Sequence, residues 1–133
     1  MTQRQSHFSA SPYEKQFGFC RALRIGQVVH VAGTGPIGVD GKTVGVGDPA
    51  AQARRCFDII QQSLEKLGAG LEDVVRTRMY LTHIDDWKII GPVHGEYFSG
   101  EPPVATLVAV AGLVDPDWRV EIEAEALLPD DHG

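Results

Sequence analysis

The stretch from Trp118 to Ala126 alternates strictly between apolar and charged residues. A period of two is typical of a β-strand with two different faces. One face collects Val120, Ile122, Ala124 and Ala126, and the other collects Arg119, Glu121, Glu123 and Glu125. The apolar face needs a hydrophobic cover, most simply a helix. The stacked carboxylates repel one another, so the charged face must meet water, basic side chains or another subunit.

The chain has 133 residues, and we interpret 1–133 as a single domain. The net charge of −6 gives no overall electrostatic reason to expect a nucleic-acid partner. No apolar run approaches the length of a membrane span, and the polar N-terminus lacks the apolar core of a signal peptide. We therefore expect a cytoplasmic protein with no membrane partner. Cys20 and Cys56 are expected to be reduced and mostly buried.

Several stretches predict elements, and we expect residues 1–12 and 129–133 to be loose termini. Alternation predicts a hairpin over residues 17–32 and a further strand over 74–82. Asp48-Pro49 predicts the start of a helix that ends near Gly68, and a second helix follows Asp85-Asp86, with a kink or broken start at Pro92. The small apolar run at 104–112 predicts a strand buried on both faces.

Together these elements predict an α+β fold with two layers, in which two helices cover one face of a mixed sheet of five to six strands. The other sheet face is then uncovered and holds Arg76 and Arg78 beside the glutamate row. The arginines either neutralise the glutamates, within the sheet or across an interface, or are simply solvated. A mixed face of this kind favours an oligomer that packs its sheets together.

Two features of the sequence bear on cofactor and metal binding. Gly33 to Gly38 matches G-x-G-x-x-G after a strand, but no helix begins directly behind it, as a dinucleotide site would require. The five histidines and two cysteines show no metal-ligand spacing. We therefore predict no cofactor and no metal.

Several strings resemble the reactive-intermediate deaminase family, RidA/YjgF, also called endoribonuclease L-PSP-like. The matching stretches span about residues 17–127. Three of them extend from 24–26 to 31–33, from 67–68 to 73–75, and from 85–87 to 97–98. The other two are Gly47-Asp48 with Gln52, and residues 120–124. The resemblance implies a chorismate-mutase-like fold and a homotrimer whose sheets face inward. It also implies clefts between subunits in which imines and enamines are hydrolysed.

The resemblance also implies which residues form the site. Glu121 corresponds to the glutamate that holds or activates water, and Gly33 to a glycine whose backbone lines the pocket. The family's substrate-binding arginine falls on Ala105, its tyrosine on Phe19 and its asparagine on Gly91. Alanine offers no donor to a carboxylate, so amino-acid-derived imines lose their anchor.

Other residues are candidates for replacing that anchor or binding the ligand. Arg21 or Arg119 could replace the arginine, with a structural ion pair as the alternative role. Thr34 and Thr106 could donate hydroxyl groups, unless they form ordinary strand-end bonds. For Glu121 itself, the alternatives are a general base and a structural partner of nearby arginines.

The leading hypothesis is a small-molecule hydrolase or deaminase-like protein acting on an imine, enamine or carbonyl compound. The alternative is a trimer that binds a metabolite without turnover. A ribonuclease or translation inhibitor is disfavoured by the acidic charge and by the absence of a His/Lys catalytic set.

Overall fold

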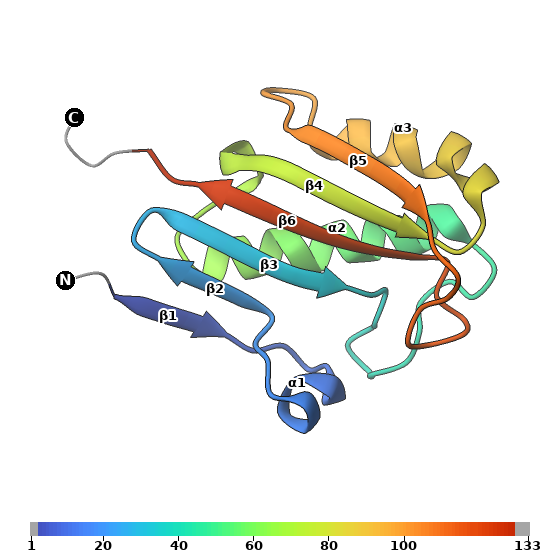
Figure 1. Cartoon of the computed structure of the whole chain (residues 1–133), viewed down its shortest axis with the longest axis horizontal. Coiled ribbons are helices and arrows are strands. Elements are labelled where there is room, and N and C mark those ends of the chain that lie inside the picture. Colours follow the sequence, from blue (N-terminus) through green and yellow to red (C-terminus); the bar gives the residue numbers. More distant parts are fainter. Residues whose placement is uncertain (1–2, 130–133) are drawn as a thin grey trace.

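The alternating stretch forms the central part of the sheet. In the computed structural model, which describes residues 3–129, it is strand β6 (Val120–Leu127). The sheet has six strands in the order β1-β2-β3-β6-β4-β5 (Figure 1). β6 pairs antiparallel with β3 (Val28–Thr34) and with β4 (Val74–Leu81), whereas β4 pairs parallel with β5 (Val104–Ala109). The mixed, six-stranded sheet agrees with the prediction.

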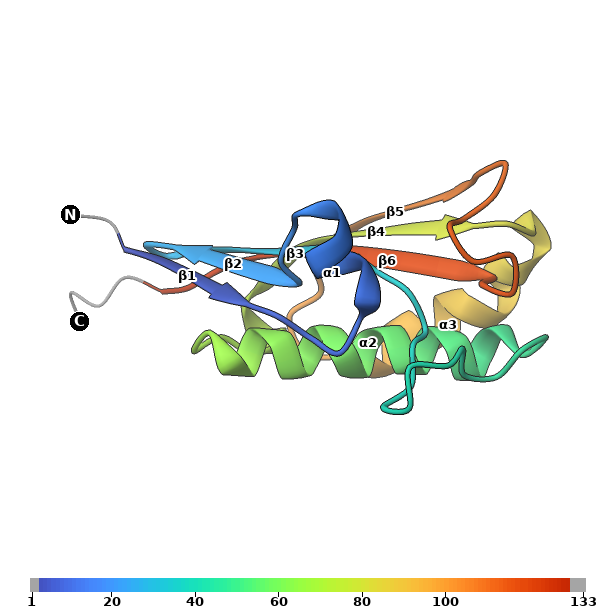
Figure 2. The ribbon, with the colours of Figure 1, turned by 90° about the horizontal axis from the view of Figure 1, so that it is seen from below.

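Two helices lie on the same side of this sheet (Figure 2). Helix α2 (Pro49–Lys66) begins where predicted, because the Asp48 carboxylate accepts a hydrogen bond from the Ala51 amide at 3.1 Å. It is followed by Gly68 with a left-handed φ of 83°. Helix α3 (Trp87–Tyr97) contains Pro92 in its interior. Short 3₁₀ turns, η1 (Leu71–Asp73) and η2 (Ile84–Asp86), precede β4 and α3.

The apolar face of β6 has the predicted helical cover. Its four apolar side chains are all buried, and so is the stripe that α2 turns toward the sheet, formed by Ala53, Cys56, Phe57, Ile60 and Leu64. Burial of this area is the main favourable contribution to folding. Among the described residues, no helix combines the length and apolar composition that crossing a membrane requires.

The N-terminal segment differs from the prediction. Residues 4–7, expected to be loose, form β1 (Arg4–His7), which pairs antiparallel with β2 (Ala22–Ile25). Residues 12–17 form helix α1 (Pro12–Phe17), so the predicted strand over 17–25 begins only at Ala22. The Ser11 side chain accepts from the Tyr13 amide and Pro12 occupies the first turn, two local signals that outweigh the alternation. Residues 1–2 and 130–133 lie outside the described part.

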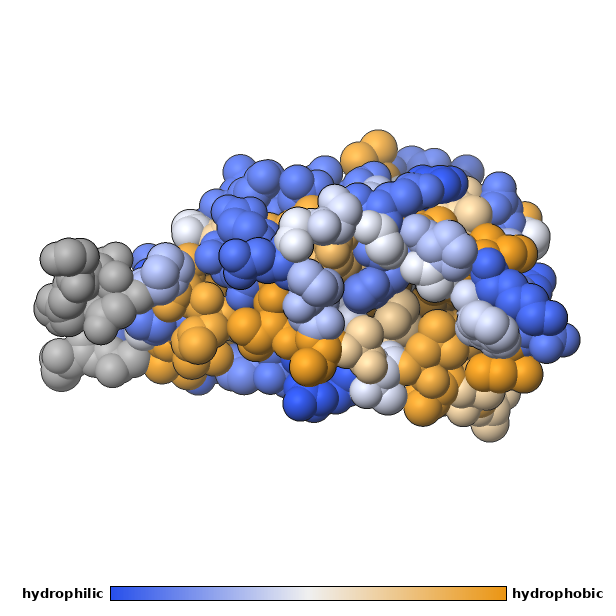
Figure 3. Space-filling model, turned by 90° about the horizontal axis from the view of Figure 1, so that it is seen from above, coloured by the Kyte–Doolittle hydropathy of each residue, from blue (hydrophilic) through white to orange (hydrophobic). Residues whose placement is uncertain are grey.

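Strand β5 is also not as predicted. The run 104–112 was expected to be buried on both faces, but β5 is the last strand of the sheet and Val104 is 58% exposed. Figure 3 looks onto the edge of the molecule that carries β5 and α3, and apolar side chains gather along it. Among residues 3–129, no strand pairs with the outer edge of β5, and its side chains are exposed except that of Leu107, which packs against the core.

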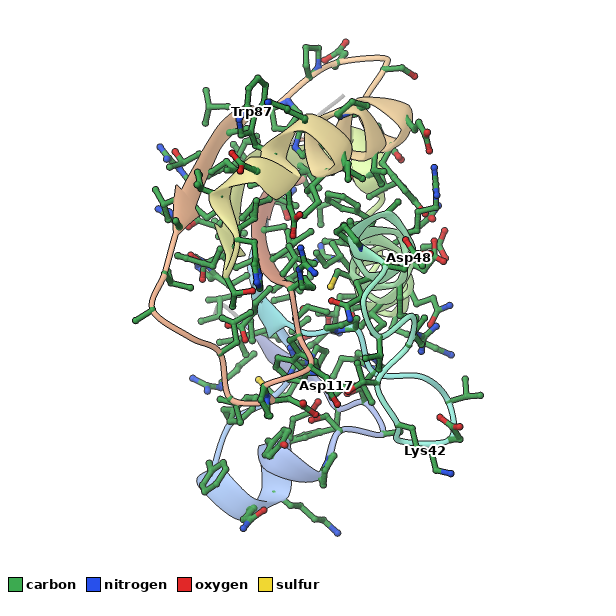
Figure 4. All side chains as sticks on the ribbon, turned by 90° about the vertical axis from the view of Figure 1, so that its right-hand side faces the viewer. Lys42, Asp48, Trp87 and Asp117 are labelled. Atoms are coloured by element: carbon green, nitrogen blue, oxygen red, sulfur yellow. The ribbon has the colours of Figure 1, made fainter. Side chains whose placement is uncertain are left out.

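A buried glutamine joins the loops at one end of the sheet. The Gln52 side-chain amide donates to the carbonyls of Gly45 (3.2 Å) and Asp117 (2.9 Å), and its oxygen accepts from the Arg119 amide (2.7 Å). Figure 4 shows Asp117 below the start of α2, which Asp48 marks. These bonds hold the loop before α2 against the loop before β6.

Candidate functional site

A cavity of about 630 Å³ lies between α1, β3, α2 and the loop before β6. This volume is in the range of small-molecule sites. Five residues that the sequence predicted for a site line it: Phe19, Arg21, Gly33, Thr34 and Glu121. They come from three separate parts of the chain, which the order β2-β3-β6 brings together.

Glu121 lies directly against the backbone of β3 at Gly33. A Cβ atom added to Gly33 would collide with Oε2 of Glu121, so only glycine leaves room for the carboxylate. Burial raises the pKa of Glu121, Arg21 opposes this, and Glu123 adds to it. A carboxylate with a raised pKa beside a cavity has the chemistry of a general base or acid.

Arg21 is held in a buried ion pair. Its Nε donates to the Glu14 carboxylate at 3.1 Å, and the two side chains are 6% and 2% exposed. Its Nη1 donates to the Gly33 carbonyl at 2.5 Å and to the Thr34 hydroxyl at 3.2 Å. Glu14 in turn accepts bonds from the amide and hydroxyl of Ser9. Arg21 therefore has the structural role that was one of its two predicted alternatives, while it also lines the cavity.

Aromatic rings form one wall of the cavity. Tyr13 and Phe17 of α1 stack with centroids 6.0 Å apart, and Trp118 meets Tyr13 edge-on at 6.3 Å. The Arg21 guanidinium lies over the Phe19 ring at 5.5 Å. Sequence reasoning missed Tyr13 and Glu14 because it assigned no structure to residues 13–16, and it missed Phe17 because it placed this residue in a strand. The string Ser11-Pro12-Tyr13-Glu14, with Gly18 as a left-handed cap, was the available signal.

The charged face of β6 is partly neutralised within the sheet, by one arginine that contacts two of the glutamates. The Arg78 guanidinium lies 3.4 Å from Glu123 and 3.0 Å from Glu125, and the Tyr80 hydroxyl donates to Glu123 at 2.5 Å. The predicted pairing of arginines with the glutamate row is confirmed for Arg78. Arg119 instead forks onto Asp86 with N–O distances of 3.0 and 2.9 Å, and it does not line the cavity. In one chain Arg119 therefore forms a structural ion pair, and its proposed role as a ligand anchor stays a prediction.

Within residues 3–129 no group of three histidine, cysteine or acidic side chains is placed to hold a metal ion. His94 bonds the Thr77 hydroxyl at 2.8 Å and packs against Phe57 and Phe98. Cys56 is fully buried, and burial raises the pKa of its thiol. These groups support the fold.

Comparison with known proteins decides the family. Residues 10–128 match the family described as endoribonuclease L-PSP. The chain belongs to this family. It is 40% identical over 118 residues to an uncharacterized protein of Streptomyces coelicolor, which covers 89% of this chain and 87% of that protein. It is also 36% identical over 105 residues to the 3-aminoacrylate deaminase RutC of Acinetobacter baylyi, covering 79% of this chain and 82% of the relative.

Solved structures of the endoribonuclease L-PSP family agree with this fold. The crystal structure of Rv2704 from Mycobacterium tuberculosis, a member of the YjgF/YER057c/UK114 family, superimposes with a TM-score of 0.86 at 41% identity. The match covers 95% of this chain and 100% of that one. The resemblance to the RidA/YjgF family is thereby confirmed.

Three residues of the predicted site do not line the cavity of one chain. Gly91 lies in α3, and Ala105 and Thr106 lie on the exposed edge strand β5. Thr106 is the register partner of Arg78 on β4. Because β5 is two strands from β6 in the sheet, Ala105 cannot complete a pocket with Glu121 through contacts like those of Arg21.

Proposed function

We propose that this protein is a RidA-type hydrolase of the cytoplasm, which acts on a small imine, enamine or carbonyl compound held against Glu121. The observation that carries the proposal is the Glu121 carboxylate, which lies over Gly33 beside the cavity and whose pKa is raised by burial. Family membership and the deaminase named among the relatives support the reaction class.

In the proposed reaction Glu121 acts as the general base. It takes a proton from a water molecule while the water oxygen bonds to the imine carbon. The imine nitrogen receives this proton, which gives a carbinolamine. The carbinolamine hydroxyl then passes its own proton to the nitrogen through Glu121 as the C–N bond breaks, so ammonia or an amine leaves and the carbonyl compound remains. Burial raises the pKa of Glu121, and the positive charge of Arg21 acts in the opposite direction by favouring the carboxylate form.

We propose further that the working unit is a homotrimer with its sheets inward, in the chorismate-mutase-like arrangement, and that sister copies complete the clefts. Two features support this assembly. The sheet face opposite α2 and α3 carries the charged row, and the apolar edge strand β5 is exposed in one chain. In this arrangement Gly91, Ala105 or Thr106 reaches a neighbouring chain's cavity. Light scattering should report a trimer, and a stable monomer would contradict the assembly.

The experiment compares Glu121→Gln with Glu123→Gln, a matched change on the same face of β6 whose side chain bonds Arg78 and Tyr80 outside the cavity. Two substrates are used: the imine released by a threonine dehydratase, measured with an imine trap, and the neutral imine N-benzylidenemethylamine, measured by absorbance. We expect the native protein to accelerate hydrolysis of at least one, and Glu121→Gln to lose roughly 100-fold or more of that acceleration. Glu123→Gln should keep it. Equal loss in both variants would contradict a general-base role.

A second candidate is a trimer that binds a metabolite without turnover. Ala105, which offers no donor at the family's arginine position, favours this alternative. It predicts that the native protein and Glu121→Gln both bind a ligand and that neither hydrolyses it. We expect no RNA binding in either case, because the chain carries a net charge of −6. Salt-sensitive RNA binding would contradict that expectation.

A further inference from the structure

We propose that the cavity selects neutral or cationic carbonyl and imine compounds with an aromatic or similarly broad apolar body, and disfavours imines that carry an α-carboxylate. This inference rests on the proposed function, because it assumes that the carbonyl or imine carbon lies at Glu121. It specifies the substrate class from two independent features of the cavity, its charge and its aromatic wall.

The charge near Glu121 disfavours a carboxylate ligand. Burial raises the pKa of Glu121, and Arg21 is the cation whose charge lowers it. The charge of Arg21 is itself matched by Glu14 at 3.1 Å. Arg21, Glu14 and Glu121 form a cluster of one cation and two acidic groups. Whether Glu121 is ionised or protonated, the cluster has no net positive charge. An incoming carboxylate therefore gains nothing from it and loses its hydration.

Two other cationic side chains, those of Arg55 and Lys66, also line the cavity. Arg55 and Lys66 stand eleven residues apart on α2, a separation of about 16 Å along the helix axis, so they border different parts of the cavity. Arg55 donates its Nε to the Ile37 carbonyl at 2.7 Å. Burial lowers the pKa of His7 and the charge of Lys66 adds to this shift, whereas the charges that shift the pKa of Glu121 are those of Arg21 and Glu123.

The aromatic wall favours a broad apolar ligand. Phe17 is 64% exposed in α1 yet lines the cavity, stacked on Tyr13, and Trp118 borders the same space. A cavity of about 150 Å³ already holds benzene. The volume of about 630 Å³ therefore has room for a ring beyond the reacting group, whereas a three-carbon imine would leave most of the aromatic wall uncovered.

The test uses four stable ketones that differ only in ring and charge: acetophenone, benzoylformate, acetone and pyruvate. Binding to the full-length protein is measured by calorimetry and saturation-transfer NMR at pH 7.5. We expect acetophenone to bind most tightly and benzoylformate, its carboxylate counterpart, about tenfold or more weakly. Acetone and pyruvate should bind more weakly still. The inference is overturned if either carboxylate binds as tightly as acetophenone, if the ring makes no difference, or if no probe binds.

Two variants test the aromatic wall. Phe17→Ala should weaken acetophenone binding roughly three- to tenfold. Phe8→Ala is the matched control, because Phe8 is similarly exposed (58%) in the same segment but does not line the cavity. Both side chains are largely in solvent, so folding is expected to survive, which circular dichroism checks. An equal change in both variants would overturn the role of the wall.

Turnover separates this inference from the proposed function. If acetophenone is preferred but neither the carboxylate imine nor N-benzylidenemethylamine is hydrolysed, the ligand class stands and the hydrolase proposal fails. If only the carboxylate imine is hydrolysed, the hydrolase proposal stands and the ligand class is overturned.

Discussion

The buried pair of Glu14 and Arg21 joins α1 to the floor of the cavity, and its removal should be costly. The change Glu14→Gln keeps the shape of the side chain but removes its charge. Arg21, which is 5% exposed, is then left buried without its counter-charge. We expect both lower stability and a displaced α1.

The size of the stability loss depends on the hydrogen bonds that Arg21 keeps after the change. Removing one partner of a buried ion pair costs about 3–5 kcal/mol. Arg21 keeps two acceptors, the Gly33 carbonyl and the Thr34 hydroxyl, so the lower end, about 3 kcal/mol, is expected. With an unfolding entropy of about 2.1 cal/mol/K per residue, a chain of 133 residues should lose about 11 °C in Tm.

Urea unfolding and thermal melting measure this loss. Glu96→Gln is the control, because the Arg54–Glu96 pair is about half exposed on both sides and solvent screens it. It should leave Tm unchanged within error. The double variant Glu14→Gln, Arg21→Met should recover part of the loss, since no buried charge is then unpaired. A cost below about 1 kcal/mol for Glu14→Gln, or a double variant less stable than the single one, would refute the reasoning.

Three further predictions follow from the site and its supports. Gly33→Ala should displace the Glu121 carboxylate and abolish activity. In the control Gly95→Ala an added Cβ meets nothing within 4 Å, so this change should stabilise α3 by roughly 0.4–1 kcal/mol. Activity assays and thermal melting of both variants check this, and an active Gly33→Ala would contradict the close approach. Because the folded-state pKa of Glu121 is raised, its contribution to stability is present below the unfolded pKa and lost as pH rises through the folded pKa. Glu121→Gln should therefore stabilise the protein at pH 7 more than at pH 4 in urea titrations, and the reverse order would count against burial of the charge. Gln52→Leu removes three buried hydrogen bonds and should cost about 3 kcal/mol in the same titrations, while an unchanged midpoint would show that the loops do not depend on it.

Sequence alone determined the elements whose signals are local. The period-two pattern of β6 and the caps of α2 depend on neighbours within a few residues. The sequence therefore predicted the strand, the helix and the side of each that is buried. The same alternation placed Glu121 on the charged face. The family resemblance implied that the backbone at Gly33 lines the same pocket, and the structure places the Glu121 carboxylate against Gly33.

Tertiary structure decided the surroundings of that glutamate. Whether Arg21 was free to bind a ligand depended on Glu14, which lies on a helix that alternation concealed. Likewise the apolar composition of β5 could not reveal that it lies at the edge of the sheet, because strand order depends on pairing between distant segments. Periodicity reports which side of an element faces away from water, but charge compensation and cavity shape depend on which elements meet. Those contacts exist only once the chain has folded.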